Sequence, residues 1–397
     1  MEKLLYLVHR IPYPPNKGDK IRSFNILRAL SKKYDVYLAS FIDDPEDYQY
    51  QEKVQEYCKQ TYIENLSPRY SKIRSTRGFI RFKPLTLDYY RSKTMQSWVS
   101  DIVNKHKISK ALVFSSSVAQ YVEGVEFRNI RRIIDFVDID SDKWRQYAKS
   151  KNWPLSWVYS REARHLQQYE HQIAKEFDYS LFVTREEASH FMTTHGLDEN
   201  HVGYFDNGVD TEFFSPEIML TSPYSKYDKA IVFAGAMDYW ANVDAVYWFA
   251  NNIFPAIKSL IPEAVFYIVG TNPAEKVKSL TSINGVYVTG RVEDIRAYVR
   301  HACCSVAPLR IARGVQNKVL EAMSMAKYVI ASPEAMEGIA ICEGCEYTTA
   351  SCEQDYIDAI CKILGNEELT IASNSRICMQ NRYSWDATLR KLLNVLS

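Results

Sequence analysis

The stretch Arg313-Gly-Val-Gln-Asn-Lys-Val-Leu-Glu-Ala-Met323 decides the fold class of this sequence. It follows residues 303–309, an apolar run that is typical of a buried strand, and it becomes helical in composition around Lys318. A strand, a short turn with a glycine and the start of a helix form a site for phosphate. The first backbone N–H groups of a helix have no intrahelical partners, and the helix dipole favours an anion there. The stretch therefore predicts an α/β sheet with a phosphate-binding edge.

Three side chains of this stretch fit a ligand that carries both phosphate and hydroxyl groups. Lys318 offers a positive charge to a phosphate, and Glu321 offers an acceptor to hydroxyls. We expect Arg313, Lys318 and Glu321 to be catalytic residues at a site for a sugar nucleotide. The turn residues beside them are expected to bind the same donor: Gly314, Val315, Gln316 and Asn317.

The length of the chain predicts two domains. Its 397 residues exceed what one hydrophobic core normally serves, so two domains of about 150 to 200 residues are expected. The formal net charge is only +1, but residues 1–204 hold 32 Lys and Arg against 26 Asp and Glu, whereas the remainder holds 17 against 22. We expect the two halves to have different tasks. A total charge near zero argues against nucleic acid as a partner.

Apolar runs alternate with helical spacing along both halves, which predicts parallel βαβ units. Helices are expected over 20–33, 156–177 and 385–396. The expected strands are 4–8, 36–41, 111–114, 132–137, 179–183, 230–235, 264–270, 286–290, 304–309 and 328–331. The turn at Asn207-Gly208 separates the series into two doubly wound, Rossmann-like domains, which we place at 1–205 and 206–383 with a cleft between them.

The loop after the first expected strand supplies candidate ligand-binding residues, because open α/β sheets bind ligands at the carboxyl ends of their strands. His9, Arg10 and Lys17 are candidates for acceptor binding, although a lone histidine is more often structural. Gly18 could let the donor approach the backbone, or it could only form a tight turn. Gly235 ends a strand of the second half and is expected to bind the donor for the same reason.

Acidic residues follow the strand 132–137 at every second position. We expect Asp138 and Asp140 to bind acceptor hydroxyls, with Asp142 beside them, and a metal site is the second interpretation of this cluster. The third interpretation is structural, because aspartate often caps the start of a helix.

Residues 69–93 mix basic and aromatic side chains. They include eight Lys and Arg, a single acid, Asp88, and five aromatic residues. This composition suits the headgroup region of an anionic bilayer or another polyanion. The alternative is a solvated helical face whose aromatic residues fill the core.

The apolar runs and the cysteines bear on the compartment. No run approaches the roughly 18 to 20 apolar residues of a membrane-spanning helix, and the first run is too short for a signal peptide. We expect a cytoplasmic protein, with peripheral association at the inner face of the membrane as an alternative. The eight cysteines are expected to be free thiols. Cys342 and Cys345 form a candidate zinc pair, but a second close pair is missing, so no metal is expected.

Three motifs carry a resemblance to a known family. They are Asn207-Gly-Val-Asp-x-x-Phe-Phe-x-Pro216, Phe233-Ala-Gly235 and Lys318-x-x-Glu321-Ala-Met323. With them the sequence resembles the retaining family-4 glycosyltransferases of GT-B fold. Residues 9–20, 135–144 and 312–318 also resemble the sugar transferases of exopolysaccharide loci associated with the PEP-CTERM/exosortase system.

The resemblance implies a division of labour between the domains. The first domain receives the acceptor, the second holds the nucleotide sugar, and the last helix, 384–397, returns to the first domain. Glu321 is implied to bind the ribose hydroxyls, while Arg291 and Val292 contact the base through backbone groups.

The sequence departs from the family pattern at two places. Where the family usually has an acid that contacts the donor sugar, this chain has Arg313. The family also commonly places an Arg and a Lys five apart after the first strand of the second domain, but residues 235–242, which end at the expected donor residue Asn242, contain neither. We infer that Arg313 and Lys318, also five apart, supply the charge for the diphosphate.

The resemblance implies a hexosyltransferase that moves a sugar with retention from a nucleotide-diphosphate donor to a glycan or polyprenyl-diphosphate-linked acceptor. The leaving phosphate takes the acceptor proton in a same-face substitution, so neither a protein nucleophile nor a cofactor or metal is required. Two alternatives remain. One is a non-catalytic protein that binds nucleotide sugar or glycan, which the missing acid at Arg313 favours, and the other is a nucleotide-sugar epimerase of related fold.

Overall fold

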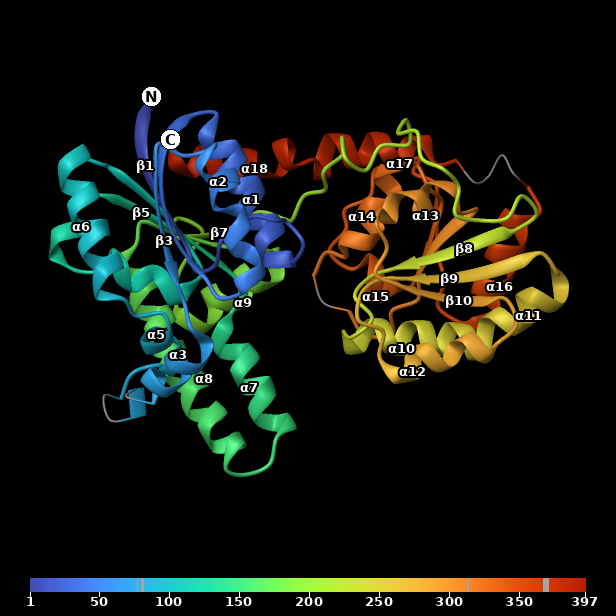
Figure 1. Ribbon diagram of the computed structural model, residues 1–397, viewed down its shortest axis with the longest axis horizontal. Helices are drawn as coiled ribbons and strands as arrows, with labels where there is room; N and C mark the ends of the chain where they lie inside the picture. Colours follow the sequence, from blue (N-terminus) through green and yellow to red (C-terminus); the bar gives the residue numbers. More distant parts are fainter. Residues whose placement is uncertain (77, 80–81, 313, 367–370) are drawn as a thin grey trace. The chain divides into compact units, whose positions relative to one another are not determined.

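A computed structural model describes residues 1–76, 78–79, 82–312, 314–366 and 371–397. The chain forms two compact α/β units (Figure 1), one made of Met1–Asp206 with Leu389–Ser397 and the other of Asn207–Thr388. The terminal helix α18 (Trp385–Leu396) is therefore shared between the units, whereas the sequence assigned residues 384–397 to the first. The predicted fold class, two doubly wound parallel sheets, is confirmed.

In its described residues, the first unit has seven parallel strands in the order β3-β2-β1-β4-β5-β6-β7. The strands are β1 (Glu2–Val8), β2 (Tyr34–Ile42), β3 (Gln60–Asn65), β4 (Lys110–Phe114), β5 (Arg131–Val137), β6 (Tyr179–Phe182) and β7 (Val202–Tyr204). The chain reverses its direction of winding between β1 and β4, which is the position where open sheets bind ligands.

Helices cover both faces of this sheet and hide its apolar strands from water. They are α1 (Gly18–Ser31), α2 (Gln51–Gln55), α3 (Pro68–Ser75), α5 (Leu85–Tyr89), α6 (Lys93–His106), α7 (Asp140–Ser150), α8 (Leu155–Glu176) and α9 (Arg185–His195). Helices α7 and α8 run side by side as a hairpin whose tip projects away from the sheet (Figure 1).

A buried ion pair ties α1 to the sheet of the first unit. The Arg22 guanidinium donates from Nε to Oδ2 of Asp135 over 2.7 Å and from Nη1 to the carbonyl of Phe205 over 3.0 Å. It also lies 3.6 Å above the Phe205 ring. Because both charges are out of water, removing one partner of such a pair typically destabilises a fold by about 3–5 kcal/mol.

The second unit has six parallel strands within its described residues, in the order β10-β9-β8-β11-β12-β13. They are β8 (Lys229–Ala234), β9 (Ala264–Val269), β10 (Val286–Gly290), β11 (Cys304–Ala307), β12 (Val329–Ala331) and β13 (Tyr347–Thr349). The helices are α10 (Trp240–Trp248), α11 (Phe254–Leu260), α12 (Glu275–Lys278), α13 (Ile295–His301), α14 (Asn317–Ser324), α15 (Pro333–Met336), α16 (Glu353–Leu364) and α17 (Ser373–Cys378).

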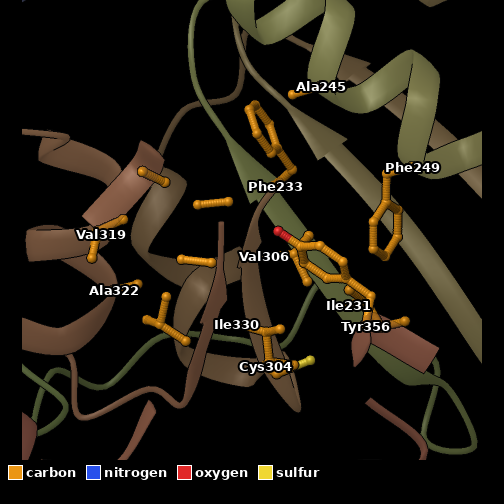
Figure 2. Packing of buried hydrophobic residues seen from close by; sticks show 14 of the residues in the cluster. Ile231, Phe233, Ala245, Phe249, Cys304, Val306, Val319, Ala322, Ile330 and Tyr356 are labelled. Atoms are coloured by element: carbon orange, nitrogen blue, oxygen red, sulfur yellow. The ribbon is translucent and has the colours of Figure 1, made fainter. Parts of the chain in front are cut away.

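One continuous core holds the second unit together. Figure 2 shows side chains from β8, β11, β12 and α14 meeting in it, among them Phe233, Val306, Val319 and Ile330. Each of these four is at most 1% exposed. The packing holds α14 against β11 and β12, and so it sets where the polar side chains of α14 lie.

Candidate functional site

Helix α14 presents two faces of different character. Val319, Leu320, Ala322 and Met323 are buried in the core, while Lys318 and Glu321 stay partly exposed beside them. The helix begins at Asn317, and Gly314, with φ of +64°, makes the turn before it. A side chain rarely adopts that φ, so the glycine is what lets the chain turn from β11 into the helix.

Lys318 is anchored by a residue from a distant part of the unit. Its Nζ donates to Oδ1 of Asn242, on α10, over 2.7 Å. The Asn242 amide in turn donates from Nδ2 to the carbonyl of Ala236 over 2.9 Å. Lys318, predicted to be catalytic, therefore lies together with the predicted donor residues Asn242 and Gly235, because a Cβ on Gly235 would sit 2.8 Å from Nδ2 of Asn242.

Both ionisable side chains of α14 have shifted pKa values. Burial lowers the pKa of Lys318 to about 8, with Glu321 opposing this shift. Burial also raises the pKa of Glu321 to about 7, and here Lys318 opposes the shift. Each group thus titrates near neutral pH, where a small change in its surroundings changes its charge.

The backbone packs tightly at the strand ends beside Lys318. Gly235 N–H donates to the carbonyl of Val269, and Gly270 N–H donates to the carbonyl of Gly290, which aligns the ends of β8, β9 and β10. A Cβ on Gly270 would lie 1.6 Å from the carbonyl oxygen of Gly235, so no side chain fits there. Gly235 and Gly270 therefore serve the close packing of the strand ends, whereas nothing lies within 4 Å of where a Cβ of Gly290 would be, so the backbone at the end of β10 is open to a ligand.

The start of α14 contains a polar atom without a partner. Among the described residues, Oδ1 of Asn317 is buried and accepts no hydrogen bond. Gln316 donates from Nε2 to the carbonyl of Gly314 over 3.1 Å and so closes the turn. Val315 faces Gly338, since a Cβ on that glycine would lie 3.8 Å from its Cγ2. A buried polar atom at a helix start fits a ligand that supplies the missing partner.

The other predicted donor residues have separate positions. Arg313, predicted to be catalytic, lies outside the described residues. Arg291 is exposed just after β10, and Val292 packs against a small apolar cluster on that side of the sheet. Gly18 belongs to the first unit, at the start of α1, and no atom lies within 4 Å of where its Cβ would be.

In the first unit, the predicted acceptor residues His9 and Arg10 share a carboxylate. Arg10 donates from Nη1 to Oδ2 of Asp19 over 2.9 Å, and His9 Nε2 lies 3.5 Å from the same oxygen. Burial alone would raise the pKa of Asp19, but the hydrogen bond from His9 and the charges of His9 and Arg10 hold it well below its usual range. Nδ1 of His9 is buried and has no partner among the described residues.

Arg10 is further held by a second acid, whereas Lys17 remains accessible. Arg10 donates from Nη2 to Oδ2 of Asp43 over 2.8 Å, so its guanidinium is clamped between two carboxylates. Lys17 is 53% exposed, and its Nζ lies 4.0 Å from Asp44. Of these two cations, Lys17 is the one free to meet a ligand at the surface.

The two predicted acceptor aspartates meet a lysine at the carboxyl edge of β5. Lys143 Nζ lies 2.5 Å from Oδ2 of Asp138 and 3.9 Å from Oδ1 of Asp140. Asp140 also accepts from Ser116 Oγ over 2.9 Å. The N-cap residue of α7, Ile139, makes no side-chain cap. The N–H of Ser141 in the first turn donates to Oε1 of Glu170 over 3.0 Å, so the capping bond seen among the described residues comes from Glu170 and not from one of the three aspartates.

Sequence reasoning missed two acids beside this group. Burial raises the pKa of Glu187 to about 8, with Asp138 adding to the shift. Burial likewise raises the pKa of Glu170 to about 8, and Asp140 adds to it. Glu170 accepts from Ser141, while Oε2 of Glu187 is buried without a partner among the described residues. Nothing in the local sequence pattern marks either residue, since both lie within amphipathic helices.

The cysteines differ from their prediction. Cys342 and Cys378 form a disulfide, with their Cα atoms 5.8 Å apart, so the expectation that all cysteines are free thiols is wrong. Their spacing of 36 residues hid the pair from the sequence. Within the described residues, the sulfur of Cys345 lies within 4.8 Å of both.

The basic and aromatic segment 69–93 is partly buried. Leu87 and Asp88 are buried, and Arg74 donates to the carbonyls of Asp88 and Tyr89, so part of the segment is structural. Tyr70, Ile73 and Phe82, however, are 63%, 71% and 78% exposed. Arg77 and Arg81 lie outside the described residues. In the described chain, none of the helices is long and apolar enough for a membrane crossing.

Comparison with known proteins bears on the unit that holds Lys318. Residues 228–366 match the family described as Glycosyl transferases group 1. The second unit thus carries a glycosyltransferase group 1 domain. Gly235, Asn242, Lys318 and Glu321 all lie inside the matched residues. No curated protein matches the sequence.

Solved structures with low sequence identity share the whole fold. A glycosyltransferase of Rickettsia africae has 15% identity and a TM-score of 0.66, with 100% of this chain and 97% of that chain covered. HepE of Anabaena in complex with UDP-glucose has 14% identity and a TM-score of 0.62, with 100% and 99% covered. Sucrose-phosphate synthase of Thermosynechococcus elongatus has 14% identity and a TM-score of 0.63, with 100% and 98% covered. The predicted GT-B fold is confirmed.

Proposed function

We propose that the protein is a family-4 type hexosyltransferase that transfers a sugar with retention from a nucleotide-diphosphate donor. The observation that carries this proposal is the arrangement at the start of α14, where Lys318 is anchored by Asn242 beside Gly235 and is followed by Glu321. A cation, the first N–H groups of a helix and an acceptor for hydroxyls are the groups that a nucleoside diphosphate needs.

The donor site suggests a role for each of its groups. The diphosphate accepts hydrogen bonds from Lys318 and from the first N–H groups of α14, and the helix dipole adds to the attraction. Glu321 accepts from the ribose hydroxyls. UDP-glucose is the first donor to test, because the similar structure of Anabaena HepE holds it.

The proposed chemistry relies on position and charge. Glycosyl transfer with retention proceeds on one face of the sugar, where the leaving diphosphate takes the proton of the attacking hydroxyl. The protein holds the reacting atoms in place and stabilises the negative charge that develops on the leaving group, and these two effects can account for most of a rate enhancement. We propose that Lys318 supplies this charge without a metal ion, so EDTA should leave the rate unchanged.

The first unit is proposed to hold the acceptor, a glycan or polyprenyl-diphosphate-linked glycan used in exopolysaccharide or cell-surface synthesis. His9, Lys17, Asp138 and Asp140 lie at the carboxyl edge of its sheet and offer both cations and hydroxyl acceptors. A lipid-linked acceptor would place the enzyme at the cytoplasmic face of a membrane.

A thermal-shift panel of nucleoside diphosphates and nucleotide sugars tests the donor site directly. A ligand at a hundred times its Kd stabilises a fold by about 2.7 kcal/mol. For a unit of this size we expect the Tm to rise by roughly 5–10 °C. The ligand with the largest shift then enters a transfer assay. A thermal shift with neither sugar transfer nor slow hydrolysis of the donor would indicate a binding protein. Conversion of the donor sugar into its epimer, without transfer, would indicate an epimerase.

A further inference from the structure

The tip of the α7–α8 hairpin exposes large apolar side chains. Trp153 is 81% exposed, Trp157 is 56% exposed and Leu155 is 49% exposed, and Tyr147 at the end of α7 is 54% exposed. Folded proteins normally bury side chains of this size, because leaving them in water forfeits the hydrophobic stabilisation. A cluster of them at one tip indicates a surface that meets an apolar partner.

The rest of the hairpin is well packed, so the exposed tip is not a loose end. The rings of Trp144 and Tyr159 lie 5.2 Å apart and join α7 to α8. Further along α8, Ala163 and Leu166 are 3% and 0% exposed against the body of the unit. The base of the hairpin is thus fixed while residues 151–155 are all exposed.

A second exposed segment lies directly against the hairpin. Phe79 stacks on Trp157 with ring centroids 6.0 Å apart, and Arg161 of α8 donates from Nη2 to the carbonyl of Gly78 over 2.7 Å. This segment carries Phe82, which is 78% exposed. The two segments therefore form one surface, which we call the hairpin surface and define by Phe82, Tyr147, Trp153, Leu155 and Trp157.

A buried carboxylate fixes the two segments relative to each other. Glu162, on α8, is 0% exposed and accepts from the backbone N–H groups of Leu85 and Thr86 over 2.7 and 2.9 Å. These N–H groups open α5, so Glu162 caps that helix from a neighbouring one. Glu162 thus ties the chain that follows Phe82 to α8 of the hairpin.

Basic side chains outnumber acidic ones around the hairpin surface. Residues 143–161 contain five Lys and Arg and no acid, although Lys143 and Arg145 pair with Asp138 and Asp142 at the base of the hairpin. The described part of residues 69–93 contains six Lys and Arg with the single acid Asp88. Asp88 is 3% exposed, so it adds little negative charge to the surface. Lys149 and Lys151 are exposed beside Trp153. A positive rim around exposed tryptophans complements the anionic headgroups and the apolar edge of a bilayer.

We propose that the hairpin surface docks the protein on an anionic lipid bilayer. Trp153, Leu155 and Phe82 enter the headgroup region, and the lysines and arginines around them meet the lipid phosphates. A bilayer fits better than a nucleic acid, because the aliphatic side chain of Leu155 cannot stack on a base and the surface is the tip of a projection rather than a groove. The idea that docking brings the enzyme to a lipid-linked acceptor rests on the proposed function. Docking itself is inferred from the hairpin surface alone.

Sedimentation of the full chain with lipid vesicles tests the proposal. We expect binding to phosphatidylcholine vesicles that contain phosphatidylglycerol, weak binding to phosphatidylcholine alone, and weaker binding when salt rises from about 0.05 to 0.5 M. W153S/L155S should lower the partition coefficient by at least about tenfold. K149E/K151E should lower it by more than about twentyfold. The conservative variant W153F should bind like the wild type.

A control variant in the second unit separates specific docking from non-specific binding to vesicles. Tyr227 is 78% exposed and Lys226 beside it is exposed, so K226E/Y227S removes similar groups elsewhere and should leave vesicle binding unchanged. Equal loss in this control and in the hairpin variants would overturn the proposal. Vesicle binding that changes neither with the lipid charge nor in the hairpin variants would also overturn the proposal. The same holds if the hairpin binds single-stranded RNA and the protein does not bind vesicles.

The donor site provides an independent readout. The thermal shift with UDP should be the same in W153S/L155S and in the wild type, because the hairpin belongs to the other unit. Vesicle binding without any nucleotide binding would refute the proposed function and leave docking intact. Nucleotide binding with no vesicle binding would refute docking alone.

Discussion

Lys318 and Asn242 lie 76 residues apart in the sequence, and Lys318 Nζ donates to Oδ1 of Asn242 over 2.7 Å. The partner is a neutral amide, so it fixes the position of the ammonium group without neutralising its charge. A lysine held this way keeps its charge for an anionic ligand, and a charge-assisted hydrogen bond is roughly twice as strong as a neutral one.

Removing this charge should impair the reaction. We expect Lys318→Ala to reduce kcat/KM for the nucleotide sugar by about a hundredfold, because the charge acts on the leaving diphosphate in a site with little water. Steady-state kinetics measures the effect. Lys278, paired with Glu275 on the surface of the same unit, serves as the control, and Lys278→Ala should be silent. An unchanged rate in Lys318→Ala would remove Lys318 from the mechanism.

Asn242→Asp tests the neutral partner separately. It keeps the size of the side chain but places a carboxylate 2.7 Å from Nζ, where it competes with the diphosphate. We expect a weaker affinity for UDP by about tenfold or more, while the Tm without ligand changes little, because the new ion pair with Nζ offsets the lost bond from Nδ2 to the carbonyl of Ala236. Isothermal titration calorimetry measures the affinity. Equal affinity in the variant and the wild type would mean that Nζ does not face the diphosphate.

The affinity for UDP should peak between about pH 7 and pH 8. A bound diphosphate favours the charged form of Lys318, whose pKa in the free protein is about 8, so binding weakens as the pH rises above that value. A ribose hydroxyl needs the carboxylate form of Glu321, whose pKa is about 7, so binding also weakens as the pH falls below it. In Lys318→Arg the affinity for UDP should no longer fall above about pH 8, because arginine stays charged. In Glu321→Gln the affinity should no longer fall below about pH 7, because glutamine does not titrate. A flat profile in the wild type contradicts both assignments.

The ribose contact of Glu321 can be isolated with a modified ligand. Glu321→Ala should weaken the binding of UDP by about ten- to a hundredfold, the usual value for a hydrogen bond to a charged group. It should hardly affect 2′,3′-dideoxy-UDP, which has no hydroxyls to offer. The four dissociation constants form a double-mutant cycle. Equal losses for both ligands would show that Glu321 acts elsewhere.

Gly270 should tolerate no side chain. Gly270→Ala places a Cβ 1.6 Å from the carbonyl oxygen of Gly235, so the strand ends must separate. We expect the free energy of unfolding of the second unit to fall by about 3 kcal/mol or more. Gly18→Ala is the matched control, since nothing lies within 4 Å of its added Cβ, and its stability should be unchanged or slightly higher. Urea titrations of both variants decide the question.

The strands that sequence reasoning missed have one physical property in common. The strands β3, β7 and β13 were missed, and each lies at an edge of its sheet. The strand β10 also lies at an edge, but its run Val286-Tyr-Val-Thr-Gly290 was recognised in the sequence. An edge strand buries less of its surface, so its sequence lacks a long apolar run; β3, for example, reads Gln-Thr-Tyr-Ile-Glu-Asn. The central strands are buried on both faces and show continuous apolar runs, which is why the fold class could be predicted.

The part of the candidate site that could be predicted is formed by polar residues that follow directly after a strand in the sequence. The phosphate-binding turn before α14 could be read from a few adjacent residues. The bond from Lys318 to Asn242 could not, because it joins two elements 76 residues apart, and the pair of Arg22 and Asp135 spans 113 residues. Glu187 was missed for a related reason. Its pKa depends on burial and on Asp138, and a pair of adjacent glutamates at the start of a helix gives no sign of either.

The cap that Glu162 forms on α5 gives the hairpin surface the properties of a two-point anchor. Glu162 holds Leu85 and Thr86, which follow Phe82 closely in the chain, against the helix that begins next to Trp153. If Phe82 and Trp153 both enter a bilayer as proposed, each raises the effective concentration of the other at the surface, so the anchor gains avidity from contacts that are individually weak. A bilayer that bends away from one point loses this avidity, so we expect the binding to depend on membrane curvature.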